Sequence, residues 1–133
     1  VANRELIRDM NTGKYSTNPY NVNAITQAMG IGSLRSEDYT RKNCQTVIKN
    51  RRFAAEKLEA MGFEMTDSSA NFLFVRHPKL DGETLYLELK KRGILIRHFT
   101  KPRIAQYNRI TVGTKEEMQA LIDAIEAIME EQA

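Results

Sequence analysis

The stretch YNRITVGTKEEMQALIDAI, residues 107–125, contains the signals that decide the fold. Its opening, YNRITVG, is typical of a β-strand that runs into a turn. The TKEE that follows is a capping box, in which Thr114 and Glu117 satisfy each other's backbone amides at the start of a helix. That helix has an apolar stripe at helical spacing, composed of Met118, Leu121, Ile122, Ile125, Ile128 and Met129. We therefore expect a strand, a turn and a helix that packs through this stripe.

The segments upstream of this stretch continue the pattern of strands and helices. FEMT, NFLFVR and GILIRHF indicate strands, and the second is apolar at consecutive positions, as in a sheet interior. Asp81 is expected to cap a helix through Arg92, and a long helix is expected from near Ser36 to Gly62. The order of helices, strand, strand, helix, strand, strand, helix predicts an α+β fold, with the helices packed on one face of a small, mostly antiparallel sheet.

The amino-terminal part of the chain has no obvious partner in this sandwich. Residues 3–11 are expected to form a short helix. The polar stretch NTGKYSTNPY, residues 11–20, is expected to be a loop because it contains Gly, Asn and Pro. A second helix is expected to begin near Val22 and to end at Gly30 and Gly32. Its candidate caps are Asn18 and Asn21.

Length and composition indicate a globular domain without disulfides or metal. With 133 residues and 41% apolar content, the chain is long enough for one compact domain with a core. Cys44 is the single cysteine and cannot form an internal disulfide, and His77 and His98 stand too far apart for metal-ligand spacing. No run of the sequence is apolar enough to cross a bilayer, and its opening has charges where a signal peptide would be apolar. We therefore expect a cytoplasmic protein without a membrane partner.

The charge balance alone does not indicate a nucleic-acid partner. The net charge is +3 and the pI is about 9.1, which would suit an anionic partner. Both signs are interleaved in KNRRFAAEKLE, however, and the carboxyl-terminal helix is acidic. This pattern favours solvated helix faces over a nucleic-acid surface.

Two arginines in strand segments are the candidate ligand-binding residues. Arg97 in ILIRHF and Arg109 in YNRITVG stand on either side of a polar loop, TKPRIAQ. A strand arginine is costly to bury alone, so it is exposed, paired or directed at a ligand. Two explanations stay open: both arginines lie at strand ends and reach water, or they form a bidentate clamp for carboxylate or phosphate.

Three further residues are possible lining residues of such a site. Asn71 opens NFLFV and is either a hydrogen-bonding partner of one arginine or an ordinary turn residue. His98 should point to the opposite side of its strand from Arg97, and without an acidic partner in the sequence it favours a surface or lining role over catalysis. Tyr20, in NPY, belongs either to a turn or to a cavity wall. With no Gly-rich phosphate loop and no nucleophile elbow, we expect the chain to bind an anion without transforming it.

Four segments occur in order along the chain: NPYNVNAITQAM, SSANFLFVR, LKKRGILIRHF and YNRITVGTKEEMQALIDAI. Together they resemble the carboxyl-terminal part of histidinol-phosphate aminotransferases, which are fold-type I enzymes dependent on pyridoxal phosphate. A weaker resemblance holds for threonine-phosphate decarboxylases, which share the same small-domain pattern. The resemblance implies transfer of an amino group between histidinol phosphate and 2-oxoglutarate, in histidine biosynthesis. It also implies that the parent protein is a homodimer.

The resemblance implies roles for the two arginines. In the family, the arginine that opens RITVGT binds the anionic end of the substrate, and this position is Arg109 here. The arginine that closes GILIR assists it, and this position is Arg97. A planar guanidinium suits both half-reactions, because it donates in-plane pairs of hydrogen bonds to phosphate and carboxylate alike.

The resemblance also implies that part of the enzyme is missing from this chain. The family's Schiff-base lysine stands in a Ser-x-Ser-Lys context, and no lysine here stands in that context. We therefore expect residues 1–32 to be the end of the large domain with a connector helix, and residues 33–133 to be the small domain. The fragment is expected to hold no pyridoxal phosphate and no catalytic residue, and to be inactive without the large domain. NTGKYSTNPY is a hinge candidate, because the family's small domain moves over the substrate.

Two hypotheses of other classes stay open. The chain is alternatively a non-catalytic α+β module for an acidic ligand or RNA, because NFLFVR places aromatic residues on a strand. That hypothesis requires Phe72 and Phe74 to be exposed on an open sheet face, and burial of both beneath helices would exclude it. The other hypothesis is a structural or dimerisation domain, with the arginines in surface ion pairs.

Overall fold

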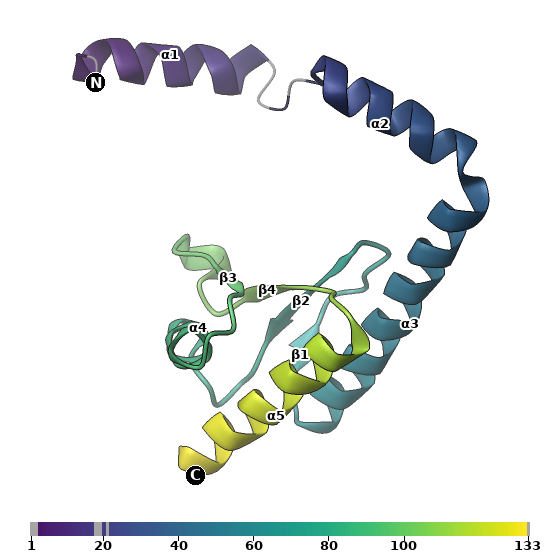
Figure 1. Cartoon of the computed structure of the whole chain (residues 1–133). Coiled ribbons are helices and arrows are strands. Elements are labelled where there is room, and N and C mark those ends of the chain that lie inside the picture. The colour runs from purple at the N-terminus through teal and green to yellow at the C-terminus, as the bar shows by residue number, and fades with distance from the viewer. Residues whose placement is uncertain (1–2, 18–19, 21, 133) are drawn as a thin grey trace. The chain divides into compact units, whose positions relative to one another are not determined.

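The computed structural model describes residues 3–17, 20 and 22–132 and is shown in Figure 1. The chain divides into two compact units, Val1–Thr40 and Arg41–Ala133. The domain limits expected from the sequence, after residue 32, refer to the parent enzyme and stay a prediction. Within the described residues, no helix is long and apolar enough to cross a membrane.

The first helix of the first unit is longer than the sequence indicated. Helix α1 spans Arg4–Thr17, so the expectation of a loop is wrong for residues 11–17. The hydroxyl of Thr12 donates to the carbonyl oxygen of Arg8 at 3.0 Å, and that of Ser16 donates to the carbonyl oxygen of Thr12. These polar side chains bond to the preceding turn, so they are compatible with a helix. Positions 18 and 19 of the expected loop lie outside the described residues.

The second helix begins and ends later than expected. Helix α2 spans Ala24–Arg35, and its cap is Asn23, whose side chain accepts a hydrogen bond from the amide of Thr26 at 2.9 Å. The candidate caps Asn18 and Asn21 lie outside the described residues. The prediction that Gly30 and Gly32 end the helix is wrong, because glycine in the αR conformation only weakens a helix and does not stop it.

The second unit is built on a four-stranded antiparallel sheet. Its strands are β1 (Glu64–Met65), β2 (Phe72–Arg76), β3 (Arg97–His98) and β4 (Asn108–Thr111), arranged in the order β1-β2-β4-β3. The expected strand GILIRHF is therefore reduced to two residues at the sheet edge. A short 3-10 helix, η1 (Pro102–Ile104), lies in the loop between β3 and β4.

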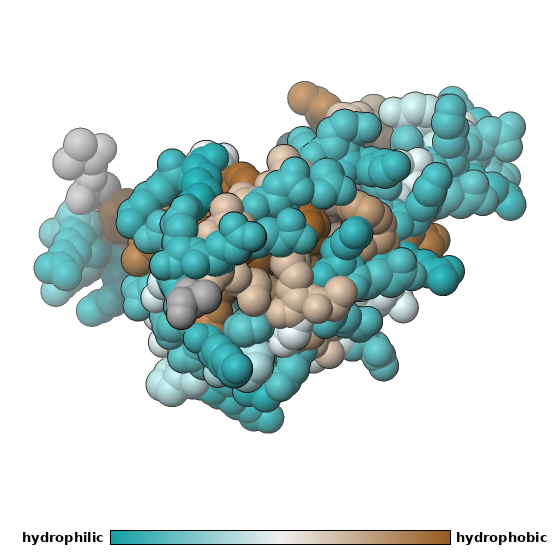
Figure 2. Space-filling model, turned by 90° about the horizontal axis from the view of Figure 1, so that it is seen from below, coloured by the Kyte–Doolittle hydropathy of each residue, from teal (hydrophilic) through white to brown (hydrophobic). Residues whose placement is uncertain are grey.

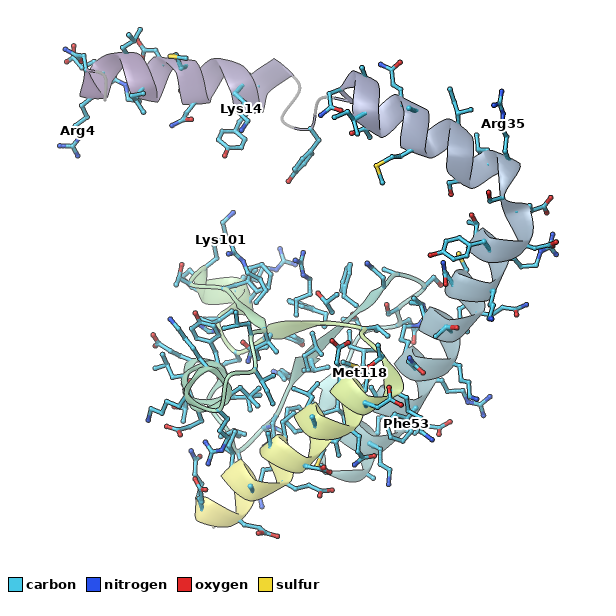
Figure 3. The ribbon with its side chains drawn as sticks, in the orientation of Figure 1. Arg4, Lys14, Arg35, Phe53, Lys101 and Met118 are labelled. Atoms are coloured by element: carbon cyan, nitrogen blue, oxygen red, sulfur yellow. The ribbon has the colours of Figure 1, made fainter. Side chains whose placement is uncertain are left out.

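Three helices cover one face of this sheet, as Figure 1 shows: α3 (Glu37–Ala60), α4 (Gly82–Lys91) and α5 (Lys115–Glu131). Phe53 of α3 and Met118 of α5 lie on the same side of the sheet in Figure 3, and both belong to or pack against the core. The predicted α+β sandwich is therefore confirmed. The buried core consists of Ala54, Leu58, Phe63, Leu73, Val75, Leu80, Leu85, Leu89, Ile110, Val112, Met118, Leu121, Ile122, Ile125 and Ile128.

The predicted helix boundaries of this unit are confirmed by their caps. The Asp81 side chain accepts from the amide of Thr84 at 2.9 Å at the start of α4. Thr114 and Glu117 form both bonds of the capping box of α5. Gly62 follows α3 with φ +89°, a conformation that favours glycine. The helix-covered side, seen in Figure 2, is mainly hydrophilic with apolar residues between the charged ones.

Candidate functional site

The sheet has an open face on the side away from the helices. In β2 and β4 the buried residues alternate with more exposed ones, so Leu73 and Ile110 point to the helices. Phe72, Phe74 and Arg109 therefore point to the opposite face. The loop between β3 and β4 carries a further cation, Lys101, which projects away from the sheet in Figure 3.

Arg97 and Arg109 face each other on this open face. They are cross-strand partners in the β3–β4 pair, and both are exposed. Side chains directly opposite each other on antiparallel strands stand close together, so two like charges here repel. Across residues 3–17, 20 and 22–132, neither arginine forms an ion pair with a carboxylate. The structure thus brings the two predicted arginines together, with their positive charge uncompensated.

Aromatic rings hold both guanidinium groups. The guanidinium carbon of Arg109 lies 5.4 Å from the ring centroid of Phe72, and that of Arg97 lies 5.7 Å from the ring centroid of Phe99. Phe74 meets the Phe99 ring edge-on, with centroids 5.8 Å apart. The phenylalanine rings are half-buried by these contacts.

A third arginine on the same face differs from these two. Arg76 lies over the ring of Tyr107 at 5.6 Å, but its guanidinium also bonds to the Glu64 carboxylate at 2.6 and 2.8 Å. The hydrogen bond that Arg76 donates to the Glu64 carboxylate is the main reason that the pKa of Arg76 is raised. Arg76 therefore has its counter-charge within the sheet, whereas Arg97 and Arg109 do not.

His98 is not brought together with the two arginines. It pairs across the strands with Asn108, and its Nδ1 lies 3.2 Å from the Asn108 Oδ1 on the helix side of the sheet. Its ring stacks on Tyr86 of α4, with centroids 5.7 Å apart. The prediction that His98 points away from Arg97 is confirmed, and its role as a lining residue stays a prediction.

Asn71 is also not brought together with the arginines. The carbonyl of Asn71 accepts from the amide of Val112 at 2.9 Å, which extends the β2–β4 pairing. In the described part of the chain, its side chain makes no hydrogen bond to Arg97 or Arg109. Tyr20 belongs to the first unit. The proposed lining roles of both residues stay predictions.

The aromatic residues of the open face bear on the RNA hypothesis. Phe72 and Phe74 are not buried beneath helices, so the condition that would exclude RNA binding is not met. Both rings are already in contact with other side chains, namely Arg109 for Phe72, and Phe99 and Tyr107 for Phe74. This leaves less ring surface for the stacking of bases than an RNA-binding sheet offers.

Phe99 and Tyr107 were missed in the sequence, although they are part of the arrangement around the arginines. Both stand just outside the observed strands, although they lie within the expected strands GILIRHF and YNRITVG. Their spacing from the arginines is nevertheless a signal, because Phe99 follows Arg97 by two positions and Tyr107 precedes Arg109 by two. A search for residues two positions from each arginine within the expected strands would have found them.

The sequence and the fold agree with a known family of enzymes. The family model for aminotransferase class I and II matches residues 2–125. This chain belongs to the class I and II aminotransferase family. The resemblance found in the sequence and the expected small-domain fold are therefore confirmed.

Individual relatives support the same assignment. The chain is 40% identical over 128 residues to the histidinol-phosphate aminotransferase of Chromohalobacter salexigens, covering 96% of this chain and 36% of that protein. The structure of the histidinol-phosphate aminotransferase from Clostridium acetobutylicum is similar with a TM-score of 0.73 at 24% identity, over 89% of this chain and 36% of that one. L-threonine-O-3-phosphate decarboxylase from Porphyromonas gingivalis has a TM-score of 0.51 at 27% identity, over 62% of this chain and 27% of that one. The chain thus spans about a third of the length of such relatives.

Proposed function

We propose that this chain is the substrate-clamping part of a pyridoxal-phosphate-dependent aminotransferase that exchanges an amino group between histidinol phosphate and 2-oxoglutarate. The observation that carries the proposal is the facing pair Arg97 and Arg109, which has no carboxylate partner in the described residues. The 40% identity to a histidinol-phosphate aminotransferase supports the substrate. The pathway is then histidine biosynthesis.

The two arginines have the chemistry that both half-reactions need. One substrate of the proposed reaction ends in a phosphate and the other in a carboxylate, and a guanidinium donates paired in-plane hydrogen bonds to either anion. The two guanidinium groups repel each other when no anion is bound. An anion between them therefore reduces this repulsion and also attracts both groups. Arg109, beside the central strand β2, is proposed as the main anchor and Arg97, on the edge strand, as its assistant.

The cofactor would be held elsewhere in the parent protein. When bound, pyridoxal phosphate supplies the electron sink for amino-group transfer. The side chains described around the open face are mainly arginines and aromatic residues, with Glu64 and Lys101, and no lysine of the chain has the Ser-x-Ser-Lys context. These residues do not fit the cofactor, so we propose that the large domain binds it and that this chain alone is inactive. The parent is proposed to be a cytoplasmic homodimer, as the resemblance implies.

A decarboxylase acting on a phosphorylated amino acid is the alternative within the family. The similarity to the Porphyromonas gingivalis enzyme favours it, and its substrate offers a phosphate to the same arginines. The two activities differ in product, since a decarboxylase releases carbon dioxide and needs no 2-oxoglutarate. An assay of the parent protein for glutamate and for carbon dioxide distinguishes them.

The test of the proposed function is made on the parent protein with Arg109→Ala. We expect kcat/KM for both histidinol phosphate and 2-oxoglutarate to fall by an amount equivalent to roughly 2–5 kcal/mol, because a charge that binds the anion is removed. Arg76→Ala is the matched control, because that arginine is already paired with Glu64. Unchanged affinity of Arg109→Ala for both substrates would contradict the proposal. Tight binding of single-stranded RNA at physiological salt would favour the RNA module instead.

A further inference from the structure

The two arginines of the clamp share a contact that distinguishes them from ordinary surface arginines. Arg109 lies over the ring of Phe72 at 5.4 Å, and Arg97 lies over the ring of Phe99 at 5.7 Å. Both rings are half-buried, and in the part of the chain that the structure describes neither arginine has an acidic partner. Each guanidinium is therefore held by a ring rather than by a carboxylate.

Arg76, on the same face, is an arginine that does have an acidic partner. It also lies over a ring, that of Tyr107, but two of its guanidinium nitrogens lie within 2.8 Å of one Glu64 oxygen. Its positive charge is neutralised, and part of its hydrogen-bonding capacity is used. An incoming anion would have to displace Glu64, whereas Arg97 and Arg109 need no such exchange.

One of the two rings beneath the clamp, that of Phe99, packs against a second pair of rings. Phe74 packs edge-on against Phe99, at an interplanar angle of 77°, and stacks on Tyr107 at a centroid distance of 4.6 Å. Phe72 and Phe74 are alternate residues of β2, the strand that pairs with β4 beside Arg109. Phe72 and Phe74 are thus built into the sheet, and Phe99 and Tyr107 pack on Phe74 from the two ends of the β3–β4 loop.

Such a surface solves a specific problem of anion binding by arginine. A free arginine side chain loses rotamer entropy worth about 2 kcal/mol when it is fixed on a ligand. A ring attracts the cation over its face and limits its rotamers before the ligand arrives. The ring does not compete for the in-plane N–H donors that phosphate and carboxylate need, and it leaves the charge intact.

We propose that Phe72 and Phe99 are positioning residues of the anion clamp, which hold Arg109 and Arg97 in place for the phosphate or carboxylate of the substrate. This inference rests on the proposed function, because it assigns these two residues to the same site. It adds a reason why the open face carries phenylalanine, and not an acidic residue, next to each arginine of the clamp.

The test measures binding of inorganic phosphate to the parent protein by titration calorimetry, together with steady-state kinetics. We expect Phe72→Leu and Phe99→Leu each to raise the phosphate dissociation constant and the KM for the phosphorylated amine about three- to tenfold, as for a lost cation–π contact. The kcat should stay within about twofold, because the rings act on binding only. Phe72→Tyr and Phe99→Tyr keep a ring and should bind phosphate like the unchanged protein.

Two comparisons separate this inference from a general packing effect. Tyr86→Leu, which removes the ring under Lys90 of α4 on the helix side of the sheet, should change the phosphate affinity less than about twofold. In an Arg109→Ala background, Phe72→Leu should have no further effect on phosphate binding. If Phe72→Leu does not fold, Phe72→Met, which also lacks a ring, serves in its place.

The outcomes that overturn the inference differ from those that overturn the proposed function. If Arg109→Ala loses phosphate affinity while both leucine variants bind like the unchanged protein, the positioning role is wrong and the clamp stands. The positioning role is equally wrong if the tyrosine variants lose as much affinity as the leucine variants. If Arg109→Ala itself binds phosphate and both substrates normally, the proposed function is wrong, and the inference falls with it.

Discussion

Arg97 and Arg109 are direct cross-strand partners on the open face of the sheet, and the described residues supply no carboxylate to either of them. Like charges in this position repel, by about 0.2–1 kcal/mol. A double-mutant cycle with Arg97→Thr and Arg109→Thr should therefore give a repulsive coupling of this size in urea unfolding at low salt. The coupling should shrink as sodium chloride screens the charges. An attractive coupling would mean that other groups compensate the positive charges of Arg97 and Arg109.

Asn108 is expected to be the most sensitive polar residue of the sheet. It is 1% exposed, its Nδ2 donates to the carbonyl oxygen of Gly82 at 2.9 Å, and its Oδ1 lies 3.2 Å from His98 Nδ1. Asn108→Ala removes both of these buried hydrogen bonds and leaves a cavity, so it should lower the free energy of unfolding by about 2–3 kcal/mol. The control is Asn71→Ala, at an exposed position, with an expected change within about 0.5 kcal/mol. Equal effects of the two substitutions in chemical denaturation would contradict this assignment.

Replacing glycine by alanine at two positions should have opposite effects on stability. A Cβ at Gly82, the first residue of α4, would lie 2.8 Å from the backbone of Gln106. Gly82→Ala should therefore destabilise the protein by about 1–3 kcal/mol through overpacking. At Gly30, inside α2, a Cβ meets nothing within 4 Å, and Gly30→Ala should stabilise the helix by about 0.5–1 kcal/mol. Both variants are checked by circular dichroism for helix content and by urea unfolding for stability. A loss of helix content or stability in Gly30→Ala would contradict the helix assigned there.

The pH dependence of stability should include a contribution from Asp81. The amide of Thr84 donates to its carboxylate, and this bond is the largest cause of its lowered pKa. Folding lowers the pKa of the Asp81 carboxyl, so its ionised form stabilises the folded protein. This stabilisation is complete above the pKa of the unfolded chain, about 3.9, and is lost as the pH falls through the pKa of the folded protein. The stability difference between the unchanged protein and Asp81→Asn should therefore be larger at pH 7 than at pH 3. A difference independent of pH would show that the charge contributes nothing.

Most boundaries in the second unit could be predicted because they depend on local chemistry. Thr114 with Glu117, Asp81 and Gly62 each act within a few residues of their own position, so the sequence contains the whole signal. In the first unit the polar residues 11–17 and the glycines of α2 were interpreted as breakers. Composition alone could not show that hydroxyl groups bond back to the preceding turn or that glycine adopts the αR conformation.

The site could be predicted only in part, for a different reason. The two arginines are evident because a charge in a strand segment needs an explanation. Their direct opposition depends on the register of β3 and β4, and two short strands joined by a loop that contains η1 do not fix it from sequence. Phe99 enters the site only through that register, because it lies beyond the end of its strand.

The dissociation constant of inorganic phosphate from the parent protein tests the central claim most directly. Titration calorimetry is compared for the unchanged protein, the double variant Arg97→Ala with Arg109→Ala, and Arg76→Ala. The account predicts that the double variant loses phosphate affinity by at least about 30-fold, equivalent to 2 kcal/mol, while Arg76→Ala changes it little. Equal affinity of the double variant and the unchanged protein would contradict the claim that Arg97 and Arg109 together hold the anion of the substrate.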